Sequence, residues 1–203
     1  MTESPSTDTR SKILIAAATM LGEDPTARLT VRAVAARAGV STGSLRHFFP
    51  TQQQLLDTVV EGLQTVEIAD DPMADPSRSP ADRLEACLQL LLTSVGTGAA
   101  ARENWIAMHD AYIASRAPDE SGNTFLAMER LGVSRVERWL DTLRQEGIGL
   151  PDDLEEPARF LLTVVNGLAL ERALPGARSR VPFEGRSLRL AVDAVLTQRT
   201  PRS

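Results

Sequence analysis

Apolar residues recur along this chain at intervals of three and four, which is the spacing of one face of an α-helix. Residues 9–21 show the pattern first, with one apolar face made of Ile13, Leu14, Ala17, Ala18 and Leu21. Further amphipathic stretches follow, and the longest covers about 122–146. No stretch alternates apolar and polar residues as a half-buried strand would. The sequence therefore predicts an all-α protein of about nine helices.

Polar residues that can cap a helix mark the starts of three short helices. Thr30 and Ser41 each follow one apolar residue and precede another by four positions, which is a hydrophobic staple around a helix cap. Gly39 ends the first of these helices, because glycine adopts the left-handed conformation at little cost. Thr51 opens the third helix in a capping box with Gln54. The pattern predicts a helix, a three-residue turn and a second helix, followed by a third.

Acidic residues are absent from this segment. Residues 29–56 contain no Asp or Glu, although the chain has a formal charge of −5. Residues 57–203, with 16 basic and 23 acidic residues, carry −7. The positive charge near the predicted turn comes from Arg28, Arg32, Arg37 and Arg46. This asymmetry indicates that one end of the molecule faces an anionic partner such as DNA.

The helix predicted over 42–49 presents a small polar strip. Its apolar residues must face the core, which leaves the pairs Thr42/Arg46 and Gly43/His47 on the exposed side. A helix that enters the DNA major groove needs such a strip: no acid that phosphate repels, a small residue for close approach, and donors for base edges. A solvated helical hairpin is the alternative, but the charge, the caps and the tight turn together favour DNA binding.

The segment "LTVRAVAARAGVSTGSLRHFFPTQQQLL" resembles the helix-turn-helix of the tetracycline-repressor (TetR) family, and the match spans about residues 9–60. The resemblance implies that the helix from Ser41 or Thr42 to Phe49 is the recognition helix. It also implies that Arg46, in place of the usual tyrosine, contacts phosphate, and that Gln52, in place of a frequent lysine, offers an uncharged hydrogen bond. The predicted DNA-binding residues are Thr30, Arg32, Ser41, Thr42, Gly43, Ser44, Arg46, His47 and Gln52.

Residues from about 66 onward are rich in Asp, Pro and Ser, which predicts a mobile connection between a DNA-binding domain, 1–60, and a helical domain, 61–203. The resemblance implies that the second domain binds a small molecule and dimerises through its last two long helices. Residues 155–174 are apolar on more than one face, which fits either a dimer or the central helix of a monomer core. The predicted dimer residues are Phe160, Val164, Leu168, Leu188, Val192 and Val195.

Aromatic and polar side chains of the second domain predict a pocket for a small-molecule effector, although such a stripe is also typical of an ordinary core. The candidates are Cys87, Trp105, Met108, His109, Tyr112, Trp139 and Asn166. His109 beside Asp110 is not predicted to form a catalytic pair, because neighbours in a helix diverge by about 100°.

Other classes of function lack their motifs. A lone Cys87 and two histidines, none at ligand spacing, predict no metal site and no cofactor. The G-x-S-x-G, Walker and dinucleotide patterns are absent, so we expect no enzyme. The polar start is unlike a signal peptide, and no apolar run reaches the ~18 residues of a membrane span, so we expect a cytoplasmic protein without a membrane partner.

These observations predict a homodimeric, ligand-responsive regulator of transcription that binds a palindromic, double-stranded DNA operator. That it represses follows from the resemblance alone. A helical adaptor that binds protein rather than DNA is the alternative, and salt dependence separates the two, because binding through arginines weakens steeply as salt rises.

Overall fold

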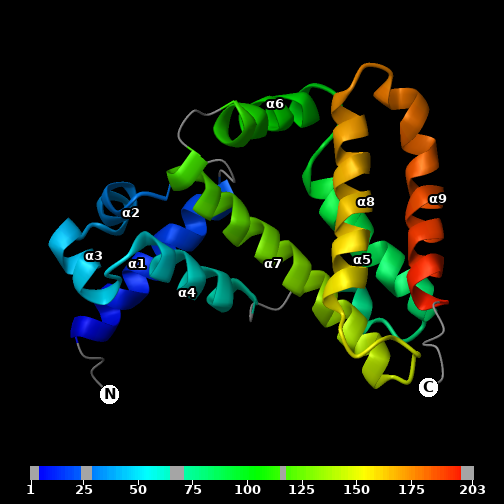
Figure 1. Cartoon of the computed structure of the whole chain (residues 1–203), viewed down its shortest axis with the longest axis horizontal. Coiled ribbons are helices and arrows are strands. Elements are labelled where there is room, and N and C mark those ends of the chain that lie inside the picture. Colours follow the sequence, from blue (N-terminus) through cyan, green and yellow to red (C-terminus); the bar gives the residue numbers. More distant parts are fainter. Residues whose placement is uncertain (1–4, 24–28, 65–70, 115–117, 198–203) are drawn as a thin grey trace. The chain divides into compact units, whose positions relative to one another are not determined.

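The structure, a computed structural model, describes residues 5–23, 29–64, 71–114 and 118–197 (Figure 1). Within these ranges it contains helices and no strands, which confirms the all-α prediction. The chain forms two compact units. Unit 1 comprises Met1–Val66 and Met108–Leu131, and unit 2 comprises Glu67–Ala107 and Gly132–Ser203.

Unit 1 begins with four helices, α1 (Pro5–Glu23), α2 (Val31–Ala38), α3 (Thr42–Phe48) and α4 (Gln52–Gln64). A π-helical turn, η2 (His109–Ile113), and the first half of α7 (Pro118–Gln145) complete it. The apolar faces of these helices meet in one core, as the sequence periodicity predicts. Its buried side chains include Ile13, Ala17, Leu21, Leu29, Val34, Leu45, Phe49, Leu55, Leu56, Val59 and Ala127.

The predicted caps fix where the short helices start. The hydroxyl oxygens of Thr30, Ser41 and Thr51 each accept a hydrogen bond from the backbone N–H three residues later, at 3.0–3.1 Å. Gly39 follows α2 with φ 68°, in the left-handed region that a side chain disfavours. These local interactions set the turn between α2 and α3 and thereby the direction in which α3 leaves it.

Unit 2 contains a 3-10 turn, η1 (Pro72–Ala74), and the helices α5 (Pro80–Ser94), α6 (Ala99–Met108), α8 (Glu155–Ala173) and α9 (Ala177–Leu196), together with the second half of α7. Helices α8 and α9 lie side by side, and α5 packs against both (Figure 1). Their core includes Leu84, Leu88, Leu92, Trp139, Leu140, Leu143, Leu161, Val165, Leu188 and Val192.

Buried arginines tie the helices of unit 2 together. Arg172 of α8 donates from Nε and Nη2 to the Glu184 carboxylate of α9, at 2.8 and 2.6 Å, and from Nη1 to the Leu92 carbonyl of α5, at 2.7 Å. Arg83 of α5 donates to the Met73 carbonyl at 3.0 Å and to both carboxylate oxygens of Glu146. A charged side chain that is buried away from water requires such partners.

Two boundary predictions differ from the structure. Of the stretch predicted as a mobile connection, residues 65–70 lie outside the described residues, but Asp71 caps η1 by accepting the Met73 N–H at 3.0 Å, and Met73 is buried. Unit 1 also extends beyond the predicted domain 1–60, because Ala127 of α7 is fully buried in its core. Among the described helices, none alone is long and apolar enough to cross a membrane. One bent pair, Pro80–Ser94 with Ala99–Ile113, would be long and apolar enough if the two helices are taken together.

Candidate nucleic-acid interface

Helix α3 presents the predicted strip to solvent. Thr42, Gly43, Arg46 and His47 are all exposed, whereas Leu45 is fully buried in the core of unit 1. The ring of His47 meets the half-buried Phe48 edge to face, with 5.2 Å between the centroids. The core side of α3 is therefore fixed by packing, and its other side offers a hydroxyl, a glycine, a guanidinium and an imidazole.

The remaining predicted DNA-binding residues surround this strip. Thr30 and Ser41 cap α2 and α3, so their hydroxyls already accept a backbone hydrogen bond. Arg32 is exposed on α2, Ser44 is half-buried on α3, and Gln52 is half-buried at the start of α4. Arg28 lies outside the described residues. A contact of each residue with DNA stays a prediction.

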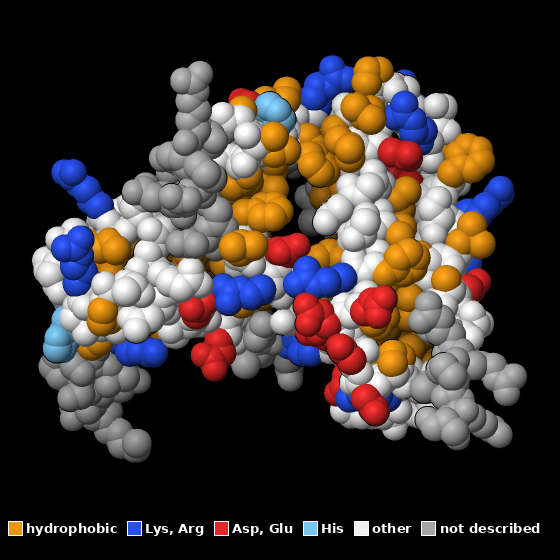
Figure 2. Space-filling view, in the orientation of Figure 1, with side chains coloured by type: hydrophobic (Ala, Val, Ile, Leu, Met, Phe, Trp, Pro, Cys, Tyr) orange, Lys and Arg blue, Asp and Glu red, His pale blue; other side chains and the backbone are white. Residues whose placement is uncertain are grey.

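The charge on this part of unit 1 is available to an anion. Arg32 and Arg46 form no ion pair with any described residue, whereas Arg37 pairs with Glu23 at 2.6 Å. On the face that Figure 2 shows, Lys and Arg side chains and no Asp or Glu lie over α2 and α3. Exposed, unpaired arginines keep their charge for phosphate, and no carboxylate lies in the strip to repel it.

Cys87 and Trp139, two of the predicted effector-binding residues, already have a hydrogen-bond partner inside unit 2. The Asp71 carboxylate accepts hydrogen bonds from Trp139 Nε1 at 3.2 Å and from Cys87 Sγ at 3.4 Å. Burial, and then the negative charge of Asp71, raise the pKa of the Cys87 thiol, so it stays protonated. Asp71 was missed in the sequence because it stands in the stretch that predicted a loose connection.

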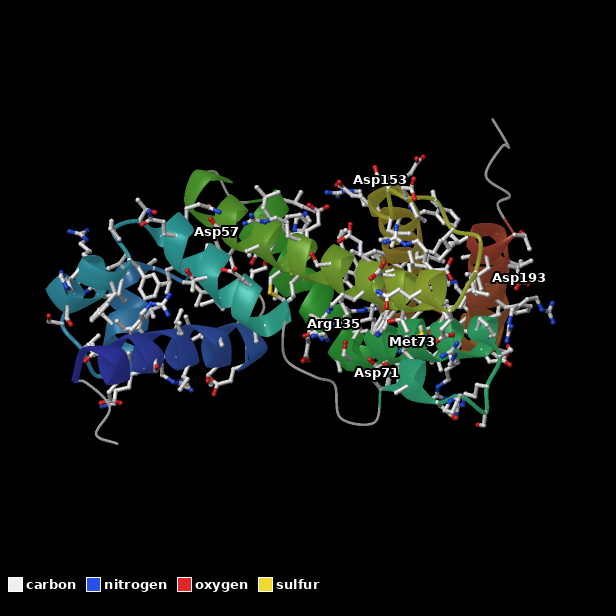
Figure 3. All side chains as sticks on the ribbon, turned by 90° about the horizontal axis from the view of Figure 1, so that it is seen from below. Asp57, Asp71, Met73, Arg135, Asp153 and Asp193 are labelled. Atoms are coloured by element: carbon white, nitrogen blue, oxygen red, sulfur yellow. The ribbon has the colours of Figure 1, made fainter. Side chains whose placement is uncertain are left out.

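Arg135 of α7 lies beside the turn that holds Asp71 and Met73 (Figure 3). Its Nε is buried and has no hydrogen-bond partner. Burial, and then the neighbouring Arg138, lower the pKa of Arg135. The interior polar groups here thus include two guanidinium groups whose Nε has no hydrogen-bond partner, those of Arg83 and Arg135, and the sequence singled out neither.

The other five effector candidates are divided between the units. Trp105 packs half-buried against the core of unit 2, and Asn166 is exposed on α8. Met108, His109 and Tyr112 belong to unit 1, where the Tyr112 ring lies 5.3 Å from that of Phe125.

The divergence predicted for His109 and Asp110 is wrong. In the π-helical turn, His109 Nδ1 lies 3.2 Å from Asp110 Oδ1, and both side chains are more than half exposed. Among the described residues, no group of three or more His, Cys, Asp or Glu side chains is placed to hold a metal ion.

Four of the six predicted dimer residues cannot face a partner. Leu168, Leu188, Val192 and Val195 are buried in the chain's own core, Val164 is half-buried, and only Phe160 is exposed. The error arises because α8 and α9 are apolar on two sides, and the residues chosen face α5 and each other. The exposed large apolar side chains on these helices and at their ends are Phe160, Leu170, Leu174, Val181, Phe183 and Leu190. Hydrophobic side chains over α8 and α9 are visible in Figure 2.

Helix α2, the tight turn at Gly39 and α3 with its exposed strip form a helix-turn-helix, the motif of one class of DNA-binding proteins. Residues 13–59 match the model of the bacterial regulatory proteins of the tetR family. The match covers the helix-turn-helix segment and not the rest of the chain.

Curated proteins are similar to part of this chain. The nucleoid occlusion factor SlmA of Idiomarina loihiensis is 34% identical over 85 residues, which cover 41% of this chain and 43% of that protein. The chain thus spans less than half the length of the curated relative it matches.

Solved structures share the fold over nearly the whole chain. Thermus thermophilus FadR, a TetR-family repressor in complex with lauroyl-CoA, has 20% identity and a TM-score of 0.50, covering 96% of this chain and 98% of that one. RolR in complex with resorcinol has 17% identity and a TM-score of 0.52, covering 97% of each chain.

Proposed function

We propose that this chain is a homodimeric, ligand-responsive regulator of transcription that binds a palindromic operator in the cytoplasm and represses. The observation that carries the DNA-binding part is the exposed, acid-free strip of α3, held by the capped turn after α2. In helix-turn-helix proteins the second helix lies in the major groove, and residues of its first turns contact base edges. Thr42, Gly43 and His47 supply this surface, and Arg46 supplies charge for phosphate.

Salt dependence tests this proposal against the helical adaptor. The purified chain is titrated into a labelled mixed-sequence duplex, and binding is followed by fluorescence anisotropy between about 50 and 200 mM KCl. We expect affinity to fall steeply and log-linearly with salt, because bound arginines release counterions. A chain that binds no DNA at the lowest salt would rule out the regulator and favour the adaptor.

Selection of bound sequences from a random duplex library tests the operator. Two recognition helices related by a two-fold axis enter successive major grooves about 34 Å apart, so we expect an inverted repeat with half-sites about one helical turn apart. Enrichment of a single half-site without symmetry would contradict the proposed dimer on DNA. Transcription from a promoter that overlaps the selected site should fall when the chain is present, and a rise would contradict repression.

The proposed dimer surface is the outer face of α8 and α9. Phe160, Leu170, Phe183 and Leu190 expose two-fifths or more of their side chains there, and Leu190 is 65% exposed. Gly167 has no atom within 4 Å of the place a Cβ would occupy, which leaves room for another helix to approach. A second copy of the chain is the proposed occupant, because a two-fold dimer pairs one such face with itself.

A matched pair of arginine substitutions tests this surface. Leu190→Arg places a charge on the exposed face, so we expect a folded monomer by sedimentation. Leu188→Arg, two positions away, places the charge in the core, where Leu188 is fully buried, so we expect an unfolded chain by circular dichroism. A wild-type chain that is monomeric at micromolar concentration would contradict the proposed dimer, as would a Leu190→Arg variant that stays dimeric.

The proposed effector is a small organic molecule bound by the helical part of the chain. FadR and RolR, which share the fold, were solved with lauroyl-CoA and resorcinol. We propose that the effector changes the separation of the two recognition helices rather than covering them. A few kcal/mol of differential affinity is enough to empty the operator. By linkage, operator DNA then weakens effector binding by the same factor, so equal affinities by calorimetry with and without DNA would contradict this mechanism.

A further inference from the structure

An arginine outside the helix-turn-helix lies against the end of the recognition helix. The guanidinium carbon of Arg10, on α1, lies 5.4 Å from the centroid of the Phe49 ring. Phe49 directly follows α3 and is only 3% exposed, so its ring is held by the core of unit 1. Helix α1, which packs against α2, α3 and α4, thus also places a cation at the end of α3.

This cation stands where the following segment supplies none. No Lys, Arg or His occurs from Phe48 to Gln64, so the start of α4 offers an anion only hydroxyl, amide and backbone groups. Phe49 is three positions from Arg46 and three from Gln52, the two predicted phosphate contacts on either side of it. Arg10 therefore lies beside Phe49, after which the next predicted phosphate contact, Gln52, carries no positive charge.

The side chain is also free to bind. Arg10 is exposed and forms no ion pair with any described residue. A guanidinium beside an aromatic ring keeps its N–H groups available, and its edge matches two oxygens of a phosphate. The Phe49 ring thereby restricts the side chain without consuming its hydrogen-bond donors.

Lys12, on the same helix, is neither free of an ion pair nor on the side of α1 that carries Arg10. Its Nζ lies 2.6 Å from Asp8 Oδ2, in an i, i+4 pair that neutralises it. Two positions along a helix correspond to a rotation of about 200°, so Lys12 points away from the side that carries Arg10.

We infer that Arg10 is a phosphate-binding residue for double-stranded DNA, contributed by α1 from outside the helix-turn-helix. The inference rests on the proposed function, because it needs the strip of α3 to face the groove. It makes the DNA surface of each protomer a joint product of α1, α2, α3 and α4, with Arg10, Arg32 and Arg46 as its charges and Gln52 as an uncharged donor.

The test compares Arg10→Gln with Lys12→Gln in the full chain. Each variant removes one positive charge from α1, so a general change of net charge affects both alike. Binding to a labelled mixed-sequence duplex is measured by anisotropy over about 25 to 150 mM KCl, where phosphate contacts set the affinity. Arg10→Lys keeps the charge and loses the planar group, and thermal unfolding by circular dichroism checks that every variant is folded.

We expect Arg10→Gln to lower the slope of log K against log[KCl] by about 0.9 for each bound protomer and to weaken binding about eightfold per protomer near 0.1 M salt. Lys12→Gln should leave both quantities near wild type, and Arg10→Lys should retain the slope. If Arg10→Gln and Lys12→Gln bind alike while the wild type shows a steep slope, Arg10 only supports Phe49 and the inference is wrong. A wild type without DNA binding would overturn the proposed function as well.

Discussion

Arginine has opposite roles in the helix-turn-helix and in unit 2. Arg32 and Arg46 are exposed and form no ion pair with any described residue. Arg83 and Arg172 are buried, and each is held by a carboxylate and a backbone carbonyl. The same side chain is a free surface charge in one region and a cross-link between helices in the other.

The distribution of acids explains this difference. Residues 29–56 contain no Asp or Glu, so an arginine there can pair only with a carboxylate from another segment, as Arg37 does with Glu23, whereas residues 57–203 contain 23 acids. A buried guanidinium without a carboxylate is costly, and an exposed one paired with a carboxylate is a poor ligand for phosphate. The position of acids along the chain is thus as informative about a binding surface as the position of bases.

The largest expected effect is on stability, from breaking the buried pair of Arg172 and Glu184. Arg172→Leu leaves Glu184 buried and unpaired, so we expect the free energy of unfolding to fall by about 3–5 kcal/mol. Urea unfolding followed by circular dichroism measures this. Arg172→Leu combined with Glu184→Leu removes both charges and should recover much of the loss; a double variant as unstable as the single one would mean that packing, not charge, is responsible.

The next effect concerns DNA affinity, from the free arginine of α3. Arg46→Ala should weaken binding to all sequences about alike and lower the salt slope by about 1 per protomer, because a phosphate contact carries no sequence information. His47→Ala, on the neighbouring position of the strip, should change which sequences are enriched in a selection. A change of base preference in Arg46→Ala with unspecific affinity intact would reverse the two roles.

A smaller effect follows from the cap that aims α3. Ser41→Ala removes the acceptor of the Ser44 N–H, which costs about 1 kcal/mol of unfolding free energy. Thr42→Ala, on the first residue of α3, removes a hydroxyl that caps nothing and is the matched control. Equal stabilities of the two variants, measured by thermal unfolding, would show that the turn does not depend on this cap.

The smallest expected effect is a pH dependence with opposite signs at two acids. The hydrogen bond from Arg83 lowers the pKa of Glu146, so this group contributes stability above its unfolded pKa of about 4.3, and that contribution is lost as pH falls through the lower folded pKa. Burial raises the pKa of Glu137, so its ionisation opposes folding as pH rises.

Urea unfolding between about pH 3.5 and pH 7 separates the two acids. Glu146→Gln should flatten the acid-side loss of stability, and Glu137→Gln should raise stability relative to wild type toward neutral pH. Parallel curves for both variants would contradict the assigned directions.

The sequence predicted the helix-turn-helix closely because its signals are local. The cap at Thr30, the left-handed glycine at Gly39 and the cap at Ser41 act within four residues of the bonds they form, so they can be recognised without knowing the fold. The exposed strip of α3 follows from them, because once the start of a short helix is known its core face is known.

Unit 2 could not be predicted to the same depth because its decisive contacts join distant segments. Asp71 meets Trp139 from across the chain, and Arg172 meets Leu92, at sequence separations that no periodicity reveals. Helix α9 begins at Ala177, before the clear apolar pattern that starts near residue 185, and contains Pro182 within it. The dimer residues were misassigned for a related reason: two apolar faces on one helix do not show which is turned inward.

Unit 1 is discontinuous in the sequence, and this has a consequence for how the protein is made. Its first segment ends at Val66, but Ala127, Met128 and Leu131 of α7 complete its core. A nascent chain therefore carries α1 to α4 with part of their apolar side uncovered until residue 131 has left the ribosome, and all of α5 and α6 is synthesised in the interval. A product that stops before residue 127 therefore lacks part of the apolar core against which α1 to α4 pack.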